Sequence, residues 1–86
     1  MKHADDAALG QLDDLLNQIR EQVGLKERKR GGFYRGSVAF LHFHEDPAGL
    51  FADVRTDADW DRVPVNTPTE KRRLVAKIKA SLRPPR

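Results

Sequence analysis

Residues 38–55 read VAFLHFHEDPAGLFADVR and carry the pattern that decides the fold. Two runs rich in aromatic and β-branched residues, 38–45 and 50–55, flank the segment Asp46-Pro47-Ala48-Gly49. Proline presets the backbone of a turn, and glycine accepts the left-handed conformation that many turns require. The stretch therefore predicts two antiparallel strands joined by a tight hairpin.

The register of this hairpin decides which side chains share a face, and two rules favour different registers. A four-residue loop, residues 46–49, sets His42 opposite Asp53. A three-residue loop with a bulge at Gly49 sets Phe43 opposite Asp53 instead, on the face away from the histidines. Because a slip of one residue exchanges the two faces of a strand, the sequence leaves both registers open.

A helix is predicted on each side of the strands. The first ends at Gly24, and its apolar residues recur at spacings of three and four: Leu9, Leu12, Leu16, Ile19 and Val23. The second begins at Thr67, with Pro68 in its first turn and Glu70 completing a capping box, and it ends before residues 84–85. Its apolar stripe is Leu74, Val75, Ile78 and Leu82.

The remaining segments complete the predicted architecture. Residues 25–32 form a basic connector. Residues 33–35 form a strand, which is followed by a turn at Gly36-Ser37. Residues 62–65 are predicted to form an edge strand, because an edge strand tolerates Pro64. We expect an α+β fold: a two-layer sandwich in the order helix, three or four antiparallel strands, helix, with both helices on one sheet face. Residues 1–86 are predicted to form a single domain, with residues 1–4 and 84–86 frayed.

Composition excludes several classes of protein. The 86 residues include no cysteine, which rules out disulfides and cysteine-based zinc sites. The first residues lack the apolar core of a signal peptide, and no run is long enough for a membrane span. We expect a small, soluble, cytoplasmic protein of bacterial type, with no membrane partner.

His42 and His44 are the residues with the clearest chemical potential. On a strand they point to one face, roughly 7 Å apart, and two such imidazoles can bind a divalent metal such as zinc. Asp53 is the best further ligand if the four-residue loop is correct, whereas His3 lies in a segment expected to fray. The simplest interpretation is two hydrogen-bonded sheet residues without a cofactor, and an acid–base role is the other alternative. No nucleophile has a catalytic sequence context, so the sequence does not indicate an enzyme.

Three functions compete on this basis. The leading hypothesis is a non-enzymatic interaction module that binds a second copy of itself or another protein through an open sheet face: Phe40, His42, His44, Phe51 and Arg55. The second is nucleic-acid binding by the basic connector and the last helix. The residues of that interface would be Lys26, Arg28, Lys29, Arg30, Arg35, Arg72, Lys79 and Arg83. The third is a metal or acid–base site on His42, His44 and Asp53. In the acidic segment DADWD, Trp60 is expected to pack against the core.

Overall fold

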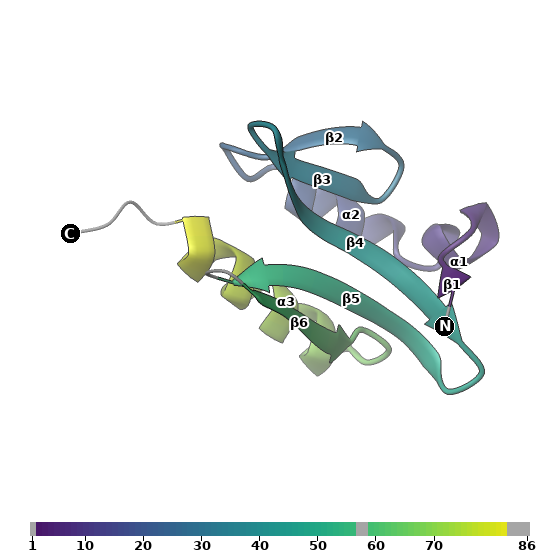
Figure 1. Cartoon of the computed structure of the whole chain (residues 1–86). Helices are drawn as coiled ribbons and strands as arrows, with labels where there is room; N and C mark the ends of the chain where they lie inside the picture. The colour runs from purple at the N-terminus through teal and green to yellow at the C-terminus, as the bar shows by residue number, and fades with distance from the viewer. Residues whose placement is uncertain (1, 57–58, 83–86) are drawn as a thin grey trace.

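An antiparallel sheet forms the body of the α+β fold, and short helices accompany it (Figure 1). The structure, a computed structural model, describes residues 2–56 and 59–82, and within them the sheet has six strands and the helices number three. In chain order the elements are β1 (Lys2–His3), α1 (Asp6–Gly10), α2 (Asp13–Arg20), β2 (Lys26–Lys29), β3 (Gly32–Arg35), β4 (Val38–Asp46), β5 (Gly49–Thr56), β6 (Asp59–Pro64) and α3 (Pro68–Leu82). The sheet order is β2-β3-β4-β5-β6, and β1 pairs with β4. The class expected from the sequence is confirmed, but the expected numbers of strands and helices are too low.

The central hairpin has the register of the four-residue loop. His42 pairs with Asp53, and the ladder continues to Asp46 opposite Gly49, so only residues 47–48 remain outside it. The register with a three-residue loop and a bulge is therefore wrong. The reason is core formation: this register pairs Leu41 with Val54 and places both in the core, each at most 1% exposed.

The helices cover one face of the sheet and leave the other without a covering layer. In Figure 1, α2 lies behind β3 and β4, and α3 lies behind β5 and β6. The core between the layers includes Leu12, Leu15, Leu16 and Ile19 from the first helical region, Leu74 and Ile78 from α3, and Phe33, Leu41, Phe43, Ala52 and Val54 from the sheet. We call the opposite side the uncovered face; its residues alternate with these core positions and include His42, His44, Phe51, Asp53, Arg55, Trp60 and Arg62.

The first helical region differs from the single helix expected over residues 9–23. It is divided into α1 and α2 at Gln11 and Leu12, directly after Gly10, a residue that weakens helices. Leu12 is nevertheless 1% exposed, so it lies in the core as the apolar spacing predicts, although it is outside both helices. Val23 is 94% exposed because α2 ends at Arg20, and the expected end at Gly24 is four residues too late.

Two further segments were expected to lack strands. Residues 26–29 of the basic connector form β2, at one edge of the sheet, and residues 59–61 of the acidic segment belong to β6, at the other edge. The edge position predicted for Pro64 is confirmed, since it ends β6. An edge strand tolerates proline because one side of its backbone faces no neighbour.

The last helix begins as the sequence indicates. The backbone N–H of Glu70 donates to Thr67 Oγ1, and the N–H of Thr67 donates to Glu70 Oε1, both at 3.1 Å, which is a capping box. Residues 84–86, expected to fray, lie outside the described residues. None of the helices in residues 2–56 and 59–82 has the length and apolar character that crossing a membrane requires.

Candidate metal site on the uncovered face

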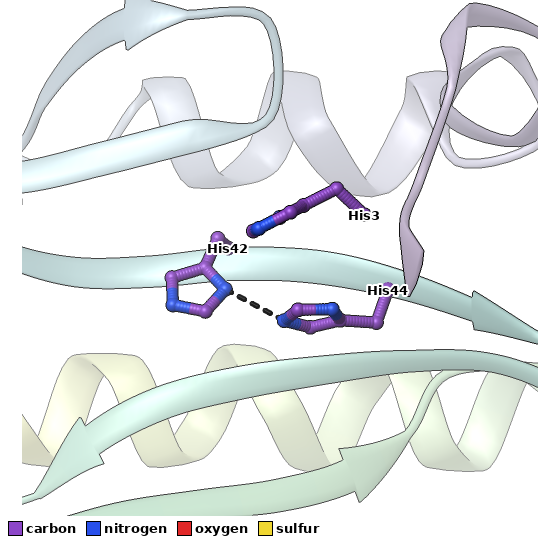
Figure 2. A group of neighbouring side chains, drawn as sticks. All are labelled: His3, His42 and His44. Carbon is purple, nitrogen blue, oxygen red and sulfur yellow. Dashed lines mark hydrogen bonds between the residues drawn. The ribbon is translucent and has the colours of Figure 1, made fainter. Parts of the chain in front are cut away.

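All three histidines of the sequence meet at one place on the sheet. His42 and His44 come from β4, and His3 comes from β1, directly opposite His44. One ring nitrogen from each histidine lies within 4.8 Å of the corresponding nitrogens of the other two. Figure 2 shows the His3 ring approaching from β1 toward the pair on β4. The cluster therefore joins the start of the described chain to its central strand.

Residues 2–4, part of the segment expected to fray, contact β4 in the structure. The Lys2 ammonium lies 3.1 Å from the Glu45 carboxylate, and the Ala4 N–H donates to the Phe43 carbonyl at 3.0 Å. The Asp5 N–H adds a bond to Glu45 Oε2 at 3.1 Å. These contacts join residues 39 to 43 positions apart in the chain, which local sequence patterns do not detect. The only sequence signal for His3 was that it is the third of three histidines.

The two polar contacts of His44 Nε2 cannot both be hydrogen bonds at the same time. His44 Nε2 lies 2.9 Å from His42 Nδ1 and 2.9 Å from Asp53 Oδ2. One imidazole nitrogen carries either one proton or one lone pair, so His44 Nε2 cannot bond to both partners. Its other nitrogen, Nδ1, is buried and has no hydrogen-bond partner among the described residues. The protein alone therefore leaves at least one of these contacts unsatisfied.

Asp53 supplies a fixed negative charge beside the imidazoles. Its carboxylate is 6% exposed and accepts two hydrogen bonds from Arg62, Nε to Oδ1 at 2.8 Å and Nη2 to Oδ2 at 2.9 Å. The Arg62 guanidinium lowers the pKa of Asp53, and burial opposes that effect. Asp53 Oδ2 also lies 4.0 Å from His42 Nδ1. The predicted grouping of His42, His44 and Asp53 is thus present in the structure.

Burial favours the neutral form of the two β4 imidazoles. Desolvation lowers the pKa of His42, and the neighbouring His44 lowers it further. Desolvation also lowers the pKa of His44, with Asp53 acting in the opposite direction. At neutral pH both rings therefore keep a lone pair that can bind a cation.

Trp60 forms one wall of the cluster and does not pack against the core as expected. Its ring centroid lies 4.7 Å from that of His42, and the Arg55 guanidinium covers it at 4.5 Å. Trp60 pairs with Arg55 across the β5–β6 ladder and is 38% exposed. Trp60 alternates with Asp59 and Asp61 along β6, so its indole lies on the opposite face from these two carboxylates, which is the uncovered face.

Phe40 is the one residue of the predicted interaction face that lies in the core and not on the uncovered face. It is 2% exposed and belongs to the core cluster. Phe33 pairs with Leu41 and Tyr34 pairs with Ala39, so Phe40 is an extra residue on β4 without a partner on β3. Such a bulge breaks the strict alternation of faces. His42, His44, Phe51 and Arg55 stay on the uncovered face.

The basic residues predicted to bind nucleic acid are distributed over different parts of the fold. Arg30 contacts Asp6 and Asp13, at 3.2 and 3.0 Å, and Arg35 donates to the Ser81 carbonyl. Arg72 and Lys79 lie on α3, in the helical layer, whereas Lys26 and Arg28 lie on β2, at an edge of the sheet. Lys29 lines a pocket beside His42, and Arg83 lies outside the described residues.

Comparison of the chain with protein-family models, with curated proteins and with solved structures finds no match. The geometry of the histidine cluster is therefore the basis for interpreting the site.

Proposed function

We propose that this protein is a metal-binding domain that holds a divalent transition-metal ion of the zinc class between His3, His42 and His44. The observation that carries the proposal is the convergence of three imidazole nitrogens within 4.8 Å. Imidazole is a preferred ligand of zinc, copper and nickel, and a set of three is common at zinc sites. We refer to these three residues with Asp53 as the histidine site.

Metal binding would draw the three histidine nitrogens together from separations of up to 4.8 Å. Zinc–nitrogen bonds of about 2.0–2.1 Å in a tetrahedron place neighbouring donors roughly 3.3 Å apart. The contact of 2.9 Å between His42 Nδ1 and His44 Nε2 needs to lengthen by only a few tenths of an ångström for that geometry. A cation between the donors would also remove the conflict at His44 Nε2, because every donor would direct a lone pair at the metal.

We infer that Asp53 supplies the fourth ligand through Oδ2, which lies 2.9 Å from His44 Nε2. Three nitrogens and one carboxylate oxygen would close a tetrahedral site, and closed sites are structural, whereas catalytic zinc sites keep a position for water. We therefore propose a binding role and not a catalytic one. Arg62 donates two hydrogen bonds to the same carboxylate, so it would fix the orientation of Asp53 toward the metal.

Metal titration of the purified protein, after treatment with a chelator, tests the proposal. Isothermal titration calorimetry with Zn²⁺ should give one site per chain, and Co²⁺ should produce the visible absorption of tetrahedral coordination. We expect His3→Gln and His42→Gln each to weaken binding by about ten-fold or more, as loss of a ligand or its support does. The control is Asp14→Asn, an exposed carboxylate on α2, which should bind as the parent does.

The outcome that contradicts the proposal is a folded protein that takes up no Zn²⁺ or Co²⁺ at millimolar concentration. Binding that survives a combined His3→Gln and His42→Gln change would contradict it equally. His3 is exposed, so its replacement keeps the test valid even if a change at the more buried His44 impairs folding.

A further inference from the structure

The uncovered face carries two aromatic rings, each paired with an arginine. The Arg28 guanidinium lies 4.8 Å from the ring centroid of Tyr34, and the Arg55 guanidinium lies 4.5 Å from that of Trp60. Tyr34 is on this face because it alternates with Phe33, which is 1% exposed in the core. Each pair presents stacked planar groups, a cationic one and an aromatic one, on the side of the sheet without helices.

Basic charge exceeds acidic charge on this face. Lys26 pairs with Tyr34 and so shares its side of the sheet, and Arg62 pairs with Asp53. Asp53 is already neutralised by its two hydrogen bonds to Arg62. The arginines beside the rings also retain donors: Arg28 uses Nη2 on the Gly36 carbonyl, and Arg55 uses Nε on the Ala39 carbonyl. Among the described residues, their remaining N–H groups have no hydrogen-bond partner and can bind anions.

We propose that the uncovered face binds single-stranded nucleic acid, with bases stacked on Tyr34 and Trp60 and phosphates bound by Lys26, Arg28 and Arg55. Stacking of unpaired bases on aromatic and guanidinium planes, combined with basic side chains, is how open sheets recognise single strands. Tyr34 is on β3 and Trp60 is on β6, three strand spacings away, which is roughly 14 Å. That span suits a chain of a few nucleotides crossing the strands.

Charge distinguishes this occupant from a second copy of the chain. Two copies meeting through this face would bring together two surfaces that each carry Lys26, Arg28 and Arg55, and like charges oppose such contacts. A polyanion neutralises them. A double helix is a poorer ligand than a single strand, because its bases are already stacked and their flat faces are hidden. The proposal does not depend on the metal, since none of the five residues named for nucleic acid is a ligand of the histidine site.

Fluorescence anisotropy with labelled oligouridylate and oligothymidylate tests this inference, in the presence of EDTA and separately of Zn²⁺. We expect Arg28→Glu and Tyr34→Leu each to weaken binding by about ten-fold, the scale of one lost stacking or phosphate contact. Arg72→Glu and Lys79→Glu make the same charge change on α3, in the helical layer, and should weaken binding less than three-fold. The slope of log K against log salt should be about −2, for three phosphates at roughly 0.7 each.

Three results would overturn the inference. The first is equal loss of affinity for the sheet and the α3 variants, which would indicate attraction to net charge alone. The second is duplex binding as tight as single-strand binding. The third is equal competition by polyglutamate, which would identify an acidic protein segment as the occupant. Circular dichroism melting of each variant separates loss of binding from loss of folding, and Lys26→Glu, on the exposed edge strand β2, serves if Tyr34→Leu unfolds.

Discussion

Gly49 shows at the scale of one residue how the central hairpin is held. Its φ is +134°, a conformation that side chains disfavour, and an added Cβ would lie 2.7 Å from Asn66 Oδ1. That amide accepts from the Leu50 N–H at 2.8 Å and donates to the Leu50 carbonyl. We expect Gly49→Ala to lower the free energy of unfolding by about 1–3 kcal/mol. Urea denaturation measures the free energy of unfolding. Gly24→Ala is the control, because Gly24 has a φ of +100° but nothing within 4 Å of an added Cβ. Equal costs for the two changes would show that Asn66 is not the cause.

Asp53 is the other residue whose replacement has a defined cost. Asparagine keeps its shape but loses the charge that Arg62 and His44 contact at 2.8–2.9 Å. We expect Asp53→Asn to destabilise the metal-free protein by about 1–3 kcal/mol, the range for a weakened buried polar group. Asp14→Asn should stay within about 0.5 kcal/mol, as exposed substitutions do. Thermal melts in EDTA compare the two, and an unaffected Asp53→Asn protein would mean that the pair with Arg62 does not stabilise the fold.

At the scale of elements, Glu27 ties the edge strand β2 to α2. It accepts from Arg20 Nε at 2.6 Å, from Arg20 Nη2 at 2.9 Å and from the Gly31 N–H at 2.8 Å. The Arg20 guanidinium lowers the pKa of Glu27 below its ordinary 4.5. A carboxyl whose pKa is lowered by folding stabilises the fold above its unfolded pKa, and this contribution disappears as the pH falls through the lower, folded value. We expect Glu27→Gln to reduce the loss of stability between pH 5 and the acid range, measured by urea denaturation at several pH values. Glu21→Gln, which removes an exposed carboxylate directly after α2, is the matched control for the change itself.

Elements with a clear local pattern were predictable, and elements fixed by distant contacts were not. The apolar runs of β4 and β5 indicated the hairpin but left two registers open, and the capping box at Thr67 located the start of α3. The spacing of three and four between apolar residues continued past Gly10, so the sequence pattern did not indicate the break between α1 and α2. The strand β2 has the sequence KERK, whose charges give no strand signal, and it forms because its backbone completes the ladder with β3.

The candidate site follows the same rule. His42, His44 and Asp53 were predictable because strand alternation and one hairpin register place them together. His3 was not, because β1 comprises two residues and its pairing with β4 spans about half of the chain. Phe40 was misplaced by a single-residue bulge, which no alternation rule anticipates. Local periodicity therefore identifies the face of a strand, and long-range pairing decides what else reaches that face.

At the scale of the whole molecule, a metal in the histidine site would link the first strand to the centre of the sheet. Free Zn²⁺ at 100 times its dissociation constant should add about 2.7 kcal/mol to the free energy of unfolding. For a domain of this size that corresponds to a rise in Tm of roughly 10–20 °C. Hydrogen exchange locates the effect: the Ala4 amide, which donates to Phe43, should gain protection when Zn²⁺ is added. In His3→Gln that local gain should vanish. Protection that rises at Ala4 in the variant as well would mean that the metal stabilises the sheet without binding β1.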